Sequence, residues 1–151
     1  MSSFLNGAQL SELRSIFQSH FEQFSSGIGN FVSIVKQPIS VISNYNSDVF
    51  AGFGNESTPL QNISYQAVSG VFPAIIIYPK MLQTKQFVQL KFNLDENEII
   101  IKLDINGHKY MDNGKTEKLL VNGTFYNTED TPTLQNYYGL RYWYYKLKST
   151  N

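Results

Sequence analysis

The chain has 151 residues, and its 12 basic and 12 acidic side chains give a formal net charge of zero at pH 7. This balance excludes the strongly basic surface typical of proteins that bind duplex nucleic acid or anionic membranes, and it removes the repulsion that keeps copies of a charged chain apart. Cysteine is absent, which excludes a disulfide framework and thiolate chemistry.

The length fits a single domain over residues 1–151 with one hydrophobic core. The longest apolar runs, such as VFPAIIIYP at residues 71–79, are too short to span a bilayer. The N-terminal residues have neither the basic start nor the continuous apolar centre of a signal peptide. The lack of cysteine fits a reducing cytosol and equally a particle assembled there, and we expect no membrane partner.

A helix is predicted over residues 6–26, because Asn6 can cap its first turn and Gln9 can complete a capping box. Apolar residues recur at spacings of three and four and form one stripe: Leu10, Leu13, Phe17, Phe21 and Phe24. Gly27 and Gly29 then end the helix. We expect the stripe to pack on a sheet of the same chain; packing on a neighbouring subunit is the alternative.

From residue 30 onward the hydrophobic period changes to two, which predicts strands. NFVSIVKQP and ISVIS come first, and NISYQAVSGVFPAIIIYP follows at residues 62–79, where Gly70 and Pro73 favour a bulge or a bend. Between them lies a loop over residues 44–62, NYNSDVFAGFGNESTPLQN, which has no period of its own yet carries several apolar residues.

The clearest alternation is in QFVQLKFNL at residues 86–94 and in IIIKLDI at residues 99–105, joined by the acidic turn DENE. It predicts that the apolar members of the second stretch point inward and that Lys102 and Asp104 point outward; the inward set is Ile99, Ile101, Leu103 and Ile105.

Three Asn-Gly pairs predict tight turns, because each supplies the positive φ that a hairpin requires; they are Asn106-Gly107, Asn113-Gly114 and Asn122-Gly123. The last strand is GLRYWYYKLK, aromatic on both faces. The predicted fold is mainly β: a small antiparallel barrel or sandwich over residues 30–148, with one N-terminal amphipathic helix and a long loop between early strands.

Catalytic and metal-binding patterns are not found. His20 and His108 share no ligand spacing, and we expect both to be structural or solvated. DENE lacks the alternating ligands of a calcium loop, and GFGN at residues 52–55 is not followed by the helix start of a phosphate-binding loop. We therefore expect no catalytic residues, no cofactor and no metal, and no enzyme activity.

Tyrosines crowd the C-terminal strand together with Trp143. One face of this strand must be core, and the other can stack nucleobases or sugar rings, or be covered by a partner subunit. The zero net charge disfavours nucleic acid, and the lack of an export signal disfavours a lectin. The candidate interface aromatics are Tyr138, Tyr142 and Tyr144.

The order of these segments resembles that of a known family. A helix is followed by a strand with IVKQP, a long loop containing GFG, VSGVFPAIIIYP, a meander with YMDNGKTEKLLVNGTFYN, and YYGLRYWYYKLK. In this order the chain is similar to the small head-to-tail connector proteins of tailed bacteriophages, in the stopper or head-closure class. The similarity covers residues 10–148, although the N-terminal helix is longer than a minimal barrel of that class needs.

The resemblance implies a structural virion protein located in the neck between capsid and tail. Copies would form a homo-oligomeric ring that contacts the portal or adaptor on one side and the tail on the other, and that helps retain the packaged double-stranded DNA. Tail-completion or terminator proteins are built on similar barrels and are the alternative within the neck. A non-catalytic barrel that binds single-stranded nucleic acid or carbohydrate is the alternative outside it.

On this reading the loop over residues 44–62 faces the channel or another subunit, because an apolar loop is costly to leave exposed. The candidate residues are Val49, Phe50, Gly52, Phe53 and Gly54, with the glycines allowing a change between closed and open pore. The alternative is a lid on the barrel of the same chain. Lys36, Lys80 and Lys85 flank the loop-bearing strands, and we expect them to be ordinary solvated lysines.

Overall fold

The computed structural model describes residues 5–43, 62–82, 94–129 and 131–150. The helices are α1 (Gly7–Phe24), the 3-10 turn η1 (Ser26–Ile28), α2 (Pro79–Leu82) and α3 (Ile105–Asp112). The strands are β1 (Phe31–Ser43), β2 (Asn62–Ile77), β3 (Glu98–Leu103), β4 (Thr116–Val121), β5 (Thr124–Thr128), β6 (Thr133–Tyr137) and β7 (Leu140–Ser149).

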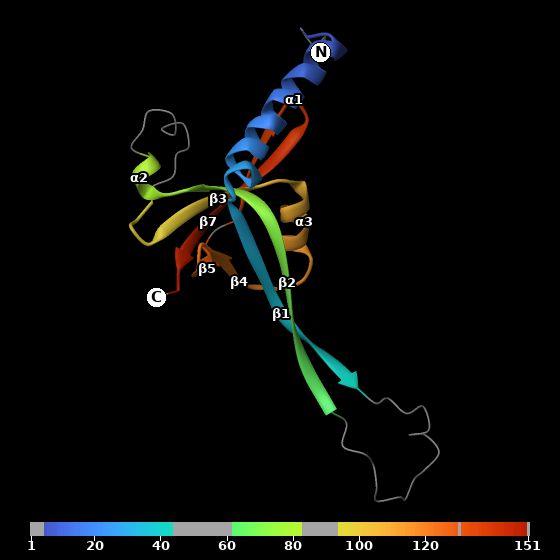
Figure 1. The fold of residues 1–151 in the computed structure, drawn as a ribbon, viewed down its shortest axis with the longest axis vertical. Helices are drawn as coiled ribbons and strands as arrows, with labels where there is room; N and C mark the ends of the chain where they lie inside the picture. The colour runs from blue at the N-terminus through green and yellow to red at the C-terminus, as the bar shows by residue number, and fades with distance from the viewer. Residues whose placement is uncertain (1–4, 44–61, 83–93, 130, 151) are drawn as a thin grey trace, which may run out of the picture.

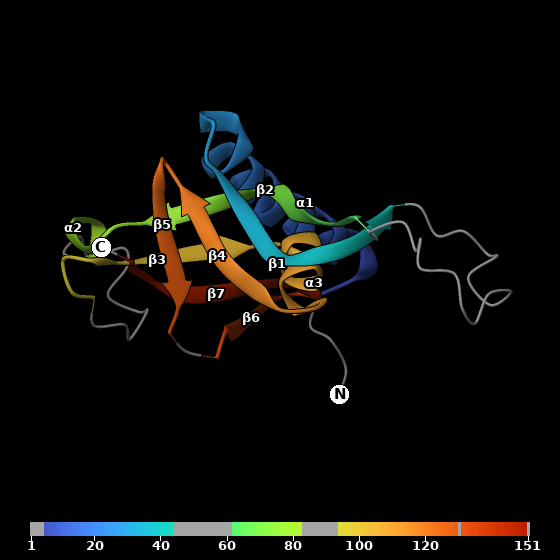
Figure 2. The same ribbon diagram turned by 90° about the horizontal axis from the view of Figure 1, so that it is seen from below.

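The strands form a closed antiparallel barrel of six, in the order β1-β2-β3-β7-β5-β4, which confirms the barrel and excludes the sandwich. Closure depends on β7, because its Trp143–Lys148 segment pairs with β3 along one edge while the other edge pairs first with β6 and then with β5. Figure 2 shows the barrel from below, with α1 on the far side and β6 as a short addition to β7.

The barrel interior is filled by side chains from every strand of the closed sheet. Val32 and Ile34 on β1, Ile101 and Leu103 on β3, and Leu147 on β7 are all fully buried in one cluster. The predicted inward positions of Ile99, Ile101 and Leu103 are confirmed. Ile105 departs from the prediction, because the strand has already ended and this residue is half-exposed at the start of α3.

The N-terminal helix has the predicted cap: the Asn6 side chain accepts from the Gln9 amide, and the Gln9 side chain accepts from the Asn6 amide. Its buried stripe, however, runs through Phe21 to Ser25, while Phe24 is 44 % exposed. Helical phase does not explain this exposure, since Phe24 lies only about 20° around the helix from Phe17 and about 60° from Phe21.

Two long strands, β1 and β2, extend as a pair beyond the barrel (Figure 1). Their register is unbroken through Gly70 and Pro73, where a bulge was predicted, and it shifts instead between Lys36 and Ile39 of β1. Gly70 serves close packing, because a Cβ there would lie 2.9 Å from the Tyr110 ring. Pro38, which has no amide to donate, occupies the bulge.

Past this bulge, the distal ribbon (residues 39–43 and 62–66) is paired only with itself among the described residues. The pairing of β1 with β4 ends at Lys36, and that of β2 with β3 begins at Ala74. The predicted loop follows from Ser43 to Asn62; its residues 44–61 lie outside the described residues, as does most of the strand predicted over residues 86–94.

The tight turns agree with the sequence prediction at some positions and differ from it at others. Asn122 and Gly123, with φ of 48° and 82°, form the predicted two-residue hairpin between β4 and β5. Tyr138 and Gly139 form an equivalent turn between β6 and β7 that the Asn-Gly pattern missed. Asn106-Gly107 is no hairpin: Asp104 caps α3 by accepting from the Gly107 amide at 2.9 Å.

Candidate functional site

The aromatic strand β7 lies largely under other parts of the protomer. Trp143 packs against the barrel core and Tyr145 lies within it, while Tyr142 and Tyr144 point to the outer face and are only 4 % and 5 % exposed. Of the three candidate interface aromatics, only Tyr138 is exposed, at 48 %. The interpretation of Tyr142 and Tyr144 as contacts for another molecule is therefore wrong for this protomer.

Helix α1 is one reason why these rings are covered. Phe21 packs on Tyr142 with ring centroids 5.0 Å apart, and Phe17 stacks on Tyr137 at 4.7 Å. Arg14 of the same helix donates to the backbone oxygen of Tyr138 in the β6–β7 turn. The helix thus packs on the sheet of its own chain, as expected from the sequence.

A lysine occupies the centre of this covered face. The ammonium of Lys102 lies 4.4 Å from the ring centroid of Tyr142, 5.0 Å from that of Tyr137 and 5.4 Å from that of Tyr144. Burial lowers the pKa of Lys102 to about 8, while the three rings attract the charged form. The outward direction of Lys102 was predicted correctly, but the side chain is buried and not solvated.

His108 takes part in a chain of polar contacts. Its Nδ1 lies 2.6 Å from the Tyr145 hydroxyl, its Nε2 lies 3.5 Å from Asp112, and its ring stacks on Trp143 at 4.0 Å. Sequence reasoning missed the carboxylate, although the i,i+4 spacing reveals it once α3 is known to be helical. Burial raises the pKa of Tyr145, which favours the neutral form of its hydroxyl. The contacts fix α3 to the barrel.

Lys36 closes one end of the barrel. Its ammonium donates to the Met111 carbonyl and to the Thr116 hydroxyl, both at 2.8 Å, and lies 5.2 Å from the Tyr110 ring centroid. Met111 is in the last turn of α3, where unpaired carbonyls favour a cation. The prediction of a solvated Lys36 is therefore wrong, whereas Lys80 is exposed and Lys85 lies outside the described residues.

A groove of about 720 Å³ runs between α1 and the start of α3. Its walls mix apolar and charged groups, including Phe21, Tyr142, Glu22, Asp104 and Arg141. Asp104 is already used as the cap of α3. Across the described parts of the chain, no group of three or more histidine, aspartate or glutamate side chains is placed to hold a metal ion.

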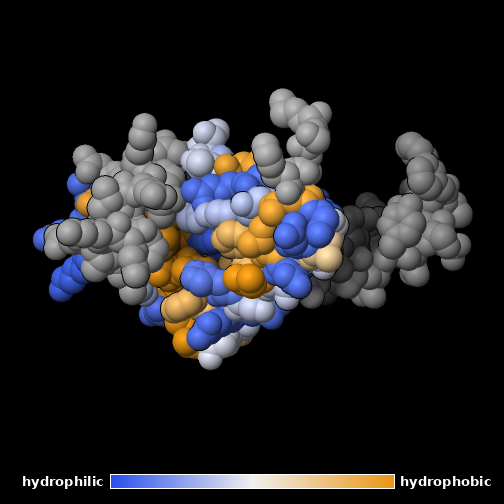
Figure 3. All heavy atoms as spheres, turned by 90° about the horizontal axis from the view of Figure 1, so that it is seen from above, coloured by the Kyte–Doolittle hydropathy of each residue, from blue (hydrophilic) through white to orange (hydrophobic). Residues whose placement is uncertain are grey.

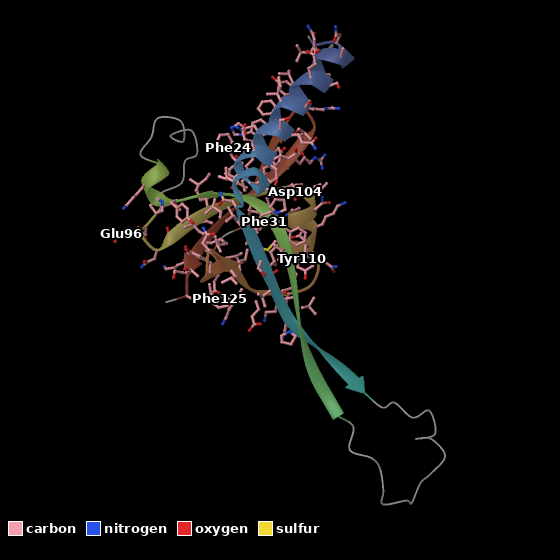
Figure 4. All side chains as sticks on the ribbon, viewed as in Figure 1. Phe24, Phe31, Glu96, Asp104, Tyr110 and Phe125 are labelled. Atoms are coloured by element: carbon pink, nitrogen blue, oxygen red, sulfur yellow. The ribbon has the colours of Figure 1, made fainter. Side chains whose placement is uncertain are left out.

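Five exposed apolar side chains come from α1, from η1 and from the paired part of β1 and β2. We call this set the apolar patch; each member is between 42 % and 65 % exposed, and the members are Ile16, Phe24, Ile28, Phe31 and Val71. Figure 4 labels Phe24 at the end of α1 and Phe31 at the start of β1. The space-filling view from above shows hydrophobic areas among hydrophilic ones on that face of the molecule (Figure 3).

The structure locates these parts relative to one another along β1. The patch lies at the first residue of the strand, and the distal ribbon lies at its last (Figure 1). The predicted loop residues, Val49 to Gly54, belong to the segment outside the described residues. The exposed backbone of the distal ribbon and the apolar patch are therefore two surfaces at which another molecule could make contact.

Comparison with protein-family models, with curated proteins and with solved structures finds no match for this chain. Of the helices in the described part of the chain, none has the length and apolarity needed to cross a membrane.

Proposed function

We propose that this chain is a non-enzymatic structural protein of the neck of a tailed bacteriophage, a ring-forming head-to-tail connector of the stopper class. The observation that carries the proposal is the paired extension of β1 and β2 beyond the barrel. The extension leads directly into residues 44–61, which contain the apolar residues Val49, Phe50 and Phe53.

The shape of the described chain supports an architectural role. The barrel is packed solid, and the ordering of a long hairpin away from it costs conformational entropy without adding to that core. A two-stranded ribbon is only marginally stable by itself in water. Such an extension is consistent with a protein that gains its full contacts in an assembly.

The aromatic positions favour this role over a binding module. An oligonucleotide- or sugar-binding surface needs exposed rings on which the ligand can stack. Tyr142 and Tyr144 are instead buried beside α1 and around Lys102. Tyr138 alone, at the tip of a turn, does not form a stacking surface.

In the neck, the ring would contact the portal or adaptor above and the tail below, and double-stranded DNA would be held nonspecifically in its channel. The protein would thus be a component of the virion that is assembled in the host cytoplasm. A tail terminator on the same barrel is the alternative, and the experiment below separates the two.

The test is deletion of the gene in the phage or prophage that encodes the chain, followed by electron microscopy of the lysate. A stopper predicts separate heads and normal-length tails, with joining restored when the purified protein is added. A terminator predicts tails of abnormal length. Normal yields of infectious tailed particles after the deletion would refute both neck assignments.

A further inference from the structure

We infer that copies of this chain associate head to tail, with the distal ribbon of one copy seated on the apolar patch of the next. The inference deepens the proposed function and rests on it for the closure of a ring. The contact itself is inferred from the two surfaces.

The distal ribbon has unpaired backbone on both edges among the described residues. β1 has no neighbour other than β2 from Pro38 to Ser43, and β2 has none other than β1 from Asn62 to Pro73. Exposed strand edges are templates for pairing with another chain, and proteins that remain monomeric protect them with charged residues, often lysine.

This protection is missing here. The sequence has no charged residue from Gln37 to Ser43, and none from Asn62 to Tyr78. The register instead pairs Ile42 with Ile63. A projecting, uncharged strand pair rich in β-branched residues is expected to be covered by protein in its working state.

The apolar patch has a matching chemistry. Its members are exposed, and the only charged residue from Ser15 to Asn30 is Glu22. Depletion of charge around exposed aromatic and aliphatic side chains is the compositional mark of an interface centre. Both surfaces thus lack charged residues in the sequence apart from Glu22, and the zero net charge of the chain removes the repulsion between copies.

The two surfaces cannot meet within one protomer. β1 begins at the patch and ends at the ribbon, and its 13 residues correspond to ~40 Å in an extended strand. The ribbon therefore cannot fold back onto the patch of its own chain. Two different surfaces, at opposite ends of β1, that meet between copies produce a heterologous contact, which closes into a ring or propagates as a filament.

The experiment uses two variants of the full chain, each with one surface blocked. Ile42→Lys with Ile63→Lys blocks the ribbon, and Ile28→Lys with Val71→Lys blocks the patch; Ile28 and Val71 are 62 % and 65 % exposed, so the lysines do not disturb the core. Leu134→Lys, at an exposed position on β6 outside both surfaces, is the matched control. Native mass spectrometry and sedimentation velocity measure the association.

We expect the wild-type chain and the Leu134→Lys control to form higher oligomers as concentration rises. Each blocked variant alone should be monomeric, and an equimolar mixture of the two should form heterodimers, because one intact ribbon can then meet one intact patch. Dimers of the patch variant alone would indicate symmetric ribbon-to-ribbon pairing and would overturn the inference. So would a wild-type chain that stays monomeric up to millimolar concentration.

A cross-linking measurement keeps the test valid if a lysine variant does not fold. The chain has no cysteine, so Ser43→Cys places a single thiol at the end of the ribbon and Ser26→Cys places one beside the patch. A short bismaleimide should join the two proteins in a mixture and should join neither to itself. If the purified chain associates in these assays but tails join normally after deletion of its gene, the contact between copies stands and only the proposed function is refuted.

Discussion

Replacement of Lys102 by methionine should stabilise the protein at pH 7. Methionine keeps the length of the side chain but removes a charge that is buried on the outer face of the barrel. Because burial lowers the pKa of Lys102 from 10.5 to about 8, the folded protein binds this proton less tightly than the unfolded chain does. The full penalty is therefore present below pH 8.

The size of the effect follows from the same numbers. The difference between 10.5 and about 8 is equivalent to ~3 kcal/mol of unfolding free energy. Solvent screening of the partly accessible ammonium, and attraction from the rings of Tyr137, Tyr142 and Tyr144, offset part of it. We therefore expect Lys102→Met to gain ~1–2 kcal/mol at pH 7.

Urea unfolding followed by the fluorescence of the single tryptophan, Trp143, measures this gain. The advantage of the variant should shrink between pH 8 and pH 10.5, because the wild-type lysine loses its proton there and no longer destabilises the fold. Lys80→Met, at an exposed lysine, should change stability by less than ~0.5 kcal/mol. A Lys102→Met variant that is less stable than wild type at pH 7, or a gain independent of pH, would refute the reasoning.

Three further predictions concern the packing of α1, the β4–β5 turn and the start of β3. Phe21→Ala should cost ~3–4 kcal/mol in the same urea assay, because it removes a buried ring that packs on Tyr142 under α1; a loss below ~1 kcal/mol would mean that α1 is only loosely attached. Gly123→Ala should cost ~1–2 kcal/mol of stability, measured by thermal unfolding, because φ is 82° at this position. Its control is Gly7→Ala in the first turn of α1, which should be neutral or stabilising in the same assay. Glu98→Gln should lower stability at neutral pH but not in acid. The hydrogen bond from the Asp95 amide is the main cause that lowers the pKa of Glu98, so the stability that the carboxylate contributes is present above the ordinary glutamate pKa and is lost as pH falls through the lowered value. Melting curves across the acid range measure this loss.

Local sequence signals predicted those elements whose determinants are themselves local. The capping box at Asn6, the alternation through Ile99 and Ile101, and the left-handed turn at Gly123 depend on residues within a few positions of one another. The Asn106-Gly107 prediction was wrong because a second local signal competed with it. The carboxylate of Asp104 caps the Gly107 amide and begins a helix, and α3 is then held by contacts from distant β7.

Whether the candidate site residues are exposed depends on which faces of the barrel other elements cover, and no local sequence pattern contains that information. Tyr142 and Tyr144 alternate with core residues as an exposed face would, yet α1 packs beside one and the other lies by Lys102. For Lys36 the local pattern did contain the information. This residue continues the inward positions of Val32 and Ile34 and is buried with them. A polar residue at the end of an apolar alternation is a signal that sequence reasoning had available and did not use.

The packed barrel also restricts how a ring of these chains could admit DNA. Its interior is filled by Val32, Ile34, Leu103 and their neighbours, and Lys36 seals one end against α3, so no passage runs through a protomer. A channel in the proposed assembly must therefore lie between copies, bordered by outer faces and by the β1–β2 extension. The extension has no lysine or arginine beyond Lys36, and it would thus offer DNA phosphates no ion pairs. A wall of this kind would retain DNA by closing the channel sterically, and it would not hold the DNA back once the channel opened.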